Sequence, residues 1–318
     1  MIITIARPFA LALSLCLLGA CQTAPKSSAG TGEDSAVPDA NKPKPYDPHI
    51  WDKGPPDPLG AFLAELDKSM RAWTNLTLTA GTRADQEKIG MLQSSLNDRV
   101  RKRQQDLIDQ LETGPPRNRA IAAGALGFSN SKEVQGPLLT ALGDGDPQVV
   151  QNAALSLAVL QDAETPLAPL LEVFQSSPNE KARANAGYAV RRLIEAGAEP
   201  TEDVVKAARR ALIDNEPFAK AQGALILALA EDGDSVPNLA ELLHDRQPLV
   251  IGAATQALVA LGRRNPRLLG PTGRALVVGL GTCPDEQRDY IRANLVLLSQ
   301  HNFGDDTKAW TEWSQRLP

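Results

Sequence analysis

The stretch that decides the fold is PQVVQNAALSLAVL, residues 147–160. Its apolar side chains recur every three or four residues, which is the spacing of one buried face of an α-helix. Proline suits the first turn of a helix, because the N–H that it lacks would have no partner there. The alanines would let neighbouring helices approach closely. The stretch therefore predicts a buried, alanine-rich helix that begins at Pro147.

The same pattern recurs along the chain, with prolines at positions 116, 147, 178, 217, 248 and 284. In four copies a leucine stands five residues before the proline and another stands ten residues after it: Leu111 and Leu126, Leu142 and Leu157, Leu212 and Leu227, Leu243 and Leu258. Three copies carry an aspartate three residues before the proline, where its carboxylate can accept hydrogen bonds from the turn: Asp144, Asp214 and Asp245.

A shorter apolar segment such as GPLLTAL, residues 136–142, precedes each turn and predicts a first helix for each unit. A single helix pair cannot bury its apolar face, so consecutive pairs are expected to stack. The sequence thus predicts an all-α fold, an α-solenoid of helix pairs over residues 113–303.

At this point a family resemblance can be stated. The segment DPQVVQNAALSLAVL, residues 146–160, resembles the second helix of HEAT repeats, and the resemblance covers about residues 110–300. The spacing of about 31 residues is shorter than the 40 or so of most HEAT repeats and is closer to the short repeats of phycobilin lyase-related proteins. In HEAT repeats an arginine pairs with an aspartate of the neighbouring repeat. That arginine is not present in every copy here, because Gln151 and Ile251 stand near its place. A continuous Asp–Arg ladder is not expected.

The resemblance also implies a binding face, because the second helices of HEAT arrays line the concave side. Nine polar residues of these helices are the predicted partner-binding set: Arg119, Gln151, Asn152, Arg183, Asn185, Lys220, Gln222, Gln256 and Arg292. The four cations would make the groove mildly basic on a chain of net charge −5, which suits an acidic partner. The alternative is that these cations pair with neighbouring Asp and Glu side chains.

The array is expected to be capped at both ends. Residues 58–112 predict an N-terminal helical region with a short helix over 58–73 and one long helix over 83–112, whose basic run we interpret as a solvated face. Residues 304–318 predict a C-terminal capping helix in which Trp310 and Trp313 cover the last repeat.

The start of the chain predicts export. Leu18-Gly19-Ala20-Cys21 follows an apolar run that is too short to cross a bilayer, and it resembles the lipobox of bacterial lipoproteins. The resemblance implies that residues 1–20 are removed and that Cys21 carries the lipid, with acyl chains such as palmitate. Gln22 implies the outer membrane of the cell envelope, more on the periplasmic face than on the cell surface. An ordinary signal peptide with a nearby cysteine is the alternative.

Residues 21–57 predict a disordered, proline-rich tether, because they carry too few apolar side chains to offset the entropy of ordering. Tyr46, Ile50 and Trp51 are its only large apolar residues. They are interpreted as a short docking segment, either for this protein's own body or for a partner, with the former favoured.

No pattern of catalytic residues stands out. The three histidines are not at metal-ligand spacing, and Cys283 is the one cysteine that would remain unmodified after export. We therefore predict no metal and no cofactor, and the net charge of −5 predicts no nucleic-acid partner. The predicted function is a membrane-anchored, non-enzymatic scaffold that binds a protein or peptide. The alternative is an enzyme or ligand carrier resembling the phycobilin-lyase type of HEAT-like repeat proteins.

Overall fold

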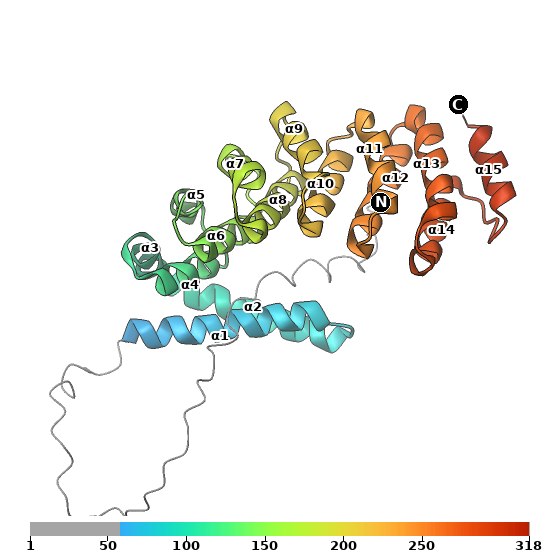
Figure 1. The fold of residues 1–318 in the computed structure, drawn as a ribbon. Helices are drawn as coiled ribbons and strands as arrows, with labels where there is room; N and C mark the ends of the chain where they lie inside the picture. Colours follow the sequence, from blue (N-terminus) through green and yellow to red (C-terminus); the bar gives the residue numbers. More distant parts are fainter. Residues whose placement is uncertain (1–57, 318) are drawn as a thin grey trace, which may run out of the picture.

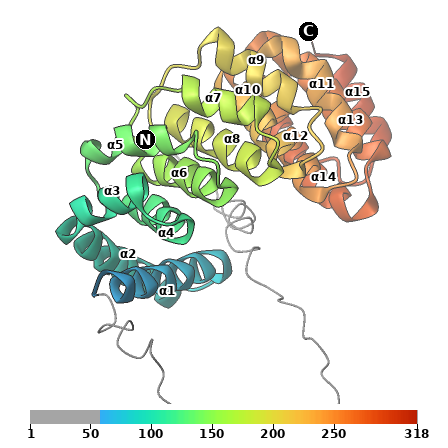
Figure 2. The ribbon, with the colours of Figure 1, turned by 60° about the vertical axis from the view of Figure 1, so that its left-hand side comes forward.

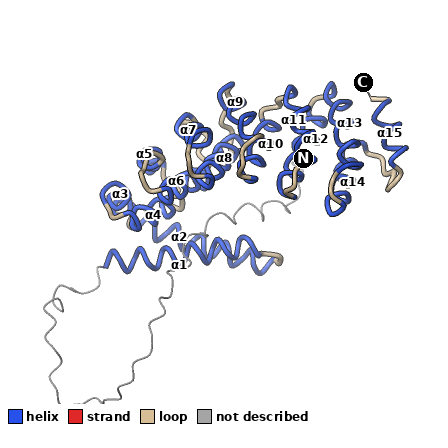
Figure 3. Tube along the Cα trace, in the orientation of Figure 1, coloured by secondary structure: helices blue, strands red, loops and turns tan. Residues whose placement is uncertain are grey.

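A computed structural model describes residues 58–317, so the predicted signal peptide, Cys21 and the predicted tether over 21–57 lie outside the described residues. Within the described residues the chain forms fifteen α-helices, four short 3₁₀ helices and no strand (Figure 3). None of these helices is both long enough and apolar enough to cross a membrane.

Twelve of the helices form six antiparallel pairs that stack into an arc (Figure 1). The outer helices are α3 (Gln104–Thr113), α5 (Gln135–Ala141), α7 (Ala168–Ser176), α9 (Glu202–Ala211), α11 (Val236–Glu241) and α13 (Leu269–Thr282). The inner helices are α4 (Pro116–Leu126), α6 (Pro147–Leu160), α8 (Glu180–Glu195), α10 (Pro217–Leu229), α12 (Pro248–Arg264) and α14 (Asp285–Ser299). Each inner helix packs on the next one, and the pairs turn together into a superhelix. The predicted α-solenoid is confirmed.

The repeated residues have the structural roles that their positions predict. The eight repeated leucines are all buried. The Oδ1 atoms of Asp144, Asp214 and Asp245 each accept a hydrogen bond at 2.8 Å from the backbone N–H two residues later. Each aspartate therefore fixes the turn that leads into the following inner helix.

Close helix packing depends on small residues at the contacts. Gly223 of α10 lies against the α9 backbone, where an added Cβ would stand 2.7 Å from the carbonyl oxygen of Ala208. A backbone atom cannot move aside as a side chain can, so no larger residue fits without shifting a helix. Alanine is abundant in the inner helices for the same reason, because short side chains let the helix axes approach closely.

Two helices precede the array, α1 (Pro58–Thr79) and α2 (Arg83–Lys102), and α1 lies against the inner side of α4 (Figures 1 and 2). The predicted single helix over 83–112 is wrong. The chain leaves helical geometry at Arg103, where φ is −125°, and α3 then starts as the outer helix of the first pair. Arg103 is held by an ion pair to Asp106 at 2.6 Å and by its guanidinium over the Phe62 ring at 4.5 Å. The array thus begins at α3, nine residues before the predicted start at 113.

The last helix, α15 (Thr307–Gln315), packs on the outer helix α13. Its Asp306 caps the helix by accepting the N–H of Ala309 at 3.0 Å. Trp310 is fully buried and donates its indole N–H to the Gly304 carbonyl at 3.0 Å. Trp313 is partly exposed and meets Trp310 edge to face. This helix covers the end of the core and leaves the inner side of α14 uncovered.

Candidate functional site

The inner helices present one row of side chains along the concave side of the arc. We define the inner row as the residues eight and twelve positions after the first residue of α6, α8, α10, α12 and α14. They are Leu155, Val159, Tyr188, Arg192, Leu225, Leu229, Gln256, Ala260, Ala293 and Leu297, and all are partly or fully exposed. Most are apolar, so this face of the array keeps apolar surface in contact with water.

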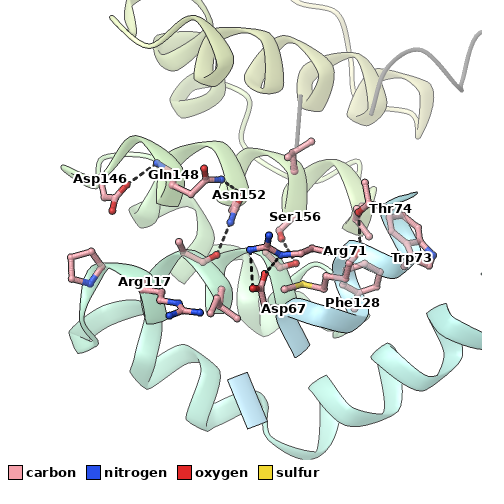
Figure 4. A pocket seen from close by; sticks show the side chains of 17 residues that line it. Asp67, Arg71, Trp73, Thr74, Arg117, Phe128, Asp146, Gln148, Asn152 and Ser156 are labelled. Atoms are coloured by element: carbon pink, nitrogen blue, oxygen red, sulfur yellow. Dashed lines mark hydrogen bonds and ion pairs between the residues drawn. The ribbon is translucent and has the colours of Figure 1, made fainter. Parts of the chain in front are cut away.

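At the N-terminal end of the array, α1 crosses the inner face and closes a cavity of about 630 Å³ against α4 and α6 (Figure 4). Its apolar lining comes from all three helices and the turn after α4: Met70, Trp73, Ile121, Phe128, Leu155 and Val159. Polar side chains stand around these residues: Asp67, Arg71, Arg117, Asp146, Gln148 and Asn152. A largely apolar cavity of this size lies within the usual range for binding sites, about 300–1,000 Å³.

Hydrogen bonds hold the wall of this cavity in place. Asn152 Nδ2 donates to the Ala120 carbonyl at 2.7 Å, and Ser156 Oγ donates to the Ala123 carbonyl at 2.5 Å. Both bonds tie α6 to α4. Asn152 also accepts a bond from Gln148 at 2.8 Å, so its amide is oriented from two sides (Figure 4). The wall is therefore rigid before any partner arrives, which lowers the entropy lost on binding.

The seat of α1 on the array is aromatic. Trp73 meets Phe128 edge to face, with ring centroids 5.2 Å apart. The indole Nε1 of Trp73 is buried without a hydrogen-bond partner among the described residues. A buried donor without a partner lowers stability by about 1–3 kcal/mol, so the packing of the two rings must outweigh this loss.

Three predicted groove cations are engaged in ion pairs between consecutive repeats, which removes the basis for a basic groove. Arg119 binds Asp144 with two hydrogen bonds of 2.8 and 2.9 Å, and Arg183 binds Asp214 with two of 2.7 and 2.8 Å. Lys220 reaches Asp245 at 2.7 Å. Charge-assisted bonds of this geometry are among the stronger polar contacts in proteins.

The fourth cation, Arg292 of α14, also has acidic partners. It pairs with Asp289 at 2.6 Å and with Asp305 of the loop before α15. The alternative stated for these cations, pairing with neighbouring acids, is therefore the one that the structure supports for all four. The expectation of a mildly basic inner face is wrong, because each positive charge is matched by a nearby carboxylate.

These pairs lower the pKa of the aspartates. For Asp144 the main cause is the hydrogen bonding from Arg119. Burial raises the pKa of Asp214 and of Asp245, but the bonds from their cations and from the backbone outweigh it, so the net pKa of each carboxyl is below its usual value. The three carboxylates are thus ionised at neutral pH and serve both the turn and the junction.

Three of the predicted groove amides are buried and cannot meet a partner. Gln151 donates to Asn179 at 3.1 Å, and Asn185 lies 3.5 Å from the Gln151 carbonyl. Gln222 has no exposed surface and accepts the Arg191 guanidinium at 2.8 Å. These side chains connect neighbouring inner helices, which is why the array buries them despite their polarity.

The remaining two predicted residues do lie at the surface of the inner side. Asn152 lines the cavity beside α1. Gln256 belongs to the inner row and donates to the hydroxyl of Tyr290 at 3.0 Å. The apolar members of the inner row were missed in the sequence, although their signal was present: leucine or tyrosine stands eight positions after three of the inner-helix starts.

The ladder of ion pairs is present at three junctions and absent at two. The position three residues after the helix start is Val150 in α6 and Ile251 in α12, and both are buried. At two of the other junctions the signal was a basic residue followed 25 positions later by an aspartate, Arg119–Asp144 and Lys220–Asp245, whereas Arg183 and Asp214 are 31 residues apart. The expectation of a discontinuous ladder is therefore confirmed.

Reactive groups are sparse among residues 58–317. No group of three or more His, Cys, Asp or Glu side chains could hold a metal ion there. His244 is exposed and contacts the Thr282 hydroxyl at 3.1 Å. The thiol of Cys283 is buried, and burial raises its pKa, so the nucleophilic thiolate is disfavoured.

Comparison with protein families bears on the first repeats of the array. A family model for HEAT repeats matches residues 105–191, from α3 into α8. Over residues 105–191 the array is similar to HEAT repeats. A designed armadillo repeat protein is similar in structure, with 18% sequence identity, a TM-score of 0.46, and coverage of 61% of this chain and 98% of that chain. No curated protein matches. Repeat solenoids of this kind present extended concave surfaces that generally bind proteins.

Proposed function

We propose that this protein is a non-enzymatic scaffold that binds an apolar segment of another protein along the inner row, from α8 to α14. The observation that carries the proposal is the exposure of this row: Leu297, in the last turn of the inner helix α14, keeps 52% of its surface exposed. An amphipathic helix or extended strand laid in the groove would cover it.

The chemistry expected of the partner follows from the row itself. Tyr188, Leu225, Leu229 and Leu297 offer apolar contact, whereas the polar groups of the inner helices are largely engaged with one another. Apolar side chains of the partner therefore supply the affinity, and polar contacts at the rim orient it. The acidic partner suggested by the sequence has lost its basis, because Arg119, Arg183, Lys220 and Arg292 are all paired.

We further propose that Cys21 anchors the scaffold to the membrane of a bacterial cell envelope, on the periplasmic face of the outer membrane. The support is the sequence Leu18–Cys21 and the proline-rich tether after it. Acyl chains add about 0.8 kcal/mol of membrane affinity per buried CH₂ group, so several chains would hold the protein permanently.

Site-specific photo-crosslinking in intact envelopes tests the binding face. A photoreactive side chain is placed at Leu297 of the inner helix α14, or at Val278 of the outer helix α13, which is 59% exposed. The two sites are matched in exposure and in apolar character. We expect one discrete crosslinked partner from Leu297 and none from Val278. Equal crosslinking from both would contradict the proposed face.

Substitution of Cys21 tests the anchor separately. Cys21→Ser should remove the site of lipid attachment, so that the protein stays as an uncleaved precursor or appears as a soluble product. Detergent partitioning and the mass of the purified chain measure this. A substituted protein that still partitions into detergent at the mature mass would overturn the anchoring proposal and leave the binding face untouched.

A further inference from the structure

The cavity between α1, α4 and α6 is the part of the inner face for which this same chain offers a candidate occupant. Its lining is mostly apolar, yet Leu155 and Val159 on its α6 side remain partly exposed. The chain enters α1 at Pro58, and α1 is one wall of the cavity. The segment just before Pro58 therefore joins the helix that forms this wall, about 14 Å along the helix axis from Asp67, the first lining residue.

We propose that residues 46–52 of this same chain dock in the cavity, with Ile50 and Trp51 against its apolar lining. Tyr46, Ile50 and Trp51 are the only large apolar residues between positions 22 and 57. Proline, serine, lysine and aspartate dominate the rest of that stretch, which therefore has little apolar surface to bury elsewhere. The segment and the cavity are thus complementary in kind.

The length of chain between them fits. Trp51 lies seven residues before Pro58, and a chain of that length spans at most about 24 Å. The cavity begins at Asp67 and continues past Met70, which lies about 18 Å along the helix axis from Pro58.

The cavity rim carries carboxylates as well as cations, and one of the cations can take a further acidic partner. Arg117 lines the cavity and is exposed, and no acidic side chain of residues 58–317 forms an ion pair with it. Asp47 and Asp52 flank Ile50 and Trp51. Docking of the apolar pair brings a carboxylate to the end of the cavity where Arg117 stands.

Connection within one chain makes even weak docking effective. A short flexible connection gives an effective concentration in the millimolar range, so a segment with millimolar intrinsic affinity is bound about half of the time, and a tighter one almost always. The inference does not depend on the proposed partner, which would occupy the inner row from α8 to α14 beyond this cavity.

Limited trypsin digestion of the full chain tests the proposal with an internal control. Trypsin cleaves after Lys or Arg unless proline follows, and in residues 1–57 only Lys26 and Lys53 meet that condition. We expect cleavage after Lys53, next to the docked segment, to be at least about tenfold slower than after Lys26. Val159→Asp, which places a charge in the cavity, and the double variant Ile50→Ala, Trp51→Ala should each accelerate cleavage after Lys53 about fivefold or more, without changing cleavage after Lys26.

The variants also separate docking from the local sequence, because Val159→Asp leaves residues 46–57 unaltered. A thermal melt checks that this variant is folded, and Gln287→Asp of α14, outside the cavity, is its matched control. If Lys53 is cleaved at the same rate in the original chain and in both test variants, the proposal is wrong.

A photoreactive side chain at His49 identifies the occupant directly. Its crosslinks should fall within one molecule, on peptides from α1, α4 or α6. Crosslinks between two molecules would mean that a second copy fills the cavity, and crosslinks spread over the whole array would mean that the segment does not dock. Either result would overturn the proposal.

Discussion

The two ends of the array treat the same position in opposite ways. Phe128 and Leu297 each stand twelve residues after the first residue of their inner helix, in the first and the last pair. Phe128 is 5% exposed because α1 and Trp73 cover it, whereas Leu297 is 52% exposed because α15 packs on the outer side. The inner face is thus mostly apolar, and it is buried only where the chain supplies a helix to cover it.

An apolar face that the chain leaves open has a physical meaning. Single exposed leucines are common on protein surfaces, but a row of them at one helical register is typical of a surface that another molecule covers. The covered end shows how such a partner would bind: it would lie across the inner helices, as α1 does.

The largest effect is expected at the covered end. Phe128→Ala should lower the free energy of unfolding by about 3–5 kcal/mol, through loss of apolar contact and the cavity left beneath α1. Denaturant melts measure it, with Met91→Ala of α2, 65% exposed, as a control that should change little. A loss under about 1 kcal/mol at Phe128 would mean that α1 does not seal this end.

A smaller effect is expected midway, where the ion pairs keep the array continuous between its ends. Asp214→Asn should lower the free energy of unfolding by about 1.5–3 kcal/mol, because Arg183 loses a charged acceptor at a largely buried junction. The control is Asp234→Asn, whose side chain is 91% exposed and should matter little. Equal effects of the two substitutions would show that the junction is not special.

The same pair gives a dependence on pH with a defined sign. The pKa of folded Asp214 lies below its unfolded value of 3.8, so its contribution is fully present above that value and is lost as the pH falls through the lower, folded pKa. The difference in stability between the original chain and Asp214→Asn should therefore shrink below about pH 4. A difference that grows on acidification would contradict the direction of the shift.

The smallest effect is expected at the open end. Leu297→Ala should change the free energy of unfolding by less than about 0.5 kcal/mol, because the side chain already meets water and alanine favours the helix. Thermal and denaturant melts measure it. A loss of 2 kcal/mol or more would mean that Leu297 is covered within the isolated chain.

The repeat made much of this fold predictable, because proline, aspartate and leucine at fixed offsets each have a local role. The break at Arg103 was not predictable from periodicity. Val100 before it and Leu107 after it keep the apolar spacing of one continuous helix. Tertiary contacts decide there, as Arg103 turns to Phe62 and Asp106.

The candidate site was less predictable than the fold. A sequence shows that Arg183 and Gln222 lie on an inner helix, but it does not show which neighbour each meets across a junction of about 31 residues. Polar residues therefore looked available when they were bonded or buried. The apolar row drew less notice, because leucine in an alanine-rich helix resembles core.

The central claim is that the open inner face binds a partner, and matched charge substitutions test it most directly. One variant carries Leu229→Asp and Leu297→Asp on the inner row, and the other carries Ile213→Asp and Val278→Asp, at two exposed apolar positions outside it. Capture of the crosslinked partner from intact envelopes is compared at equal amounts of folded protein. We expect capture to fall at least tenfold for the inner variant and to change less than twofold for the other variant. Undiminished capture by the inner variant would contradict the central claim.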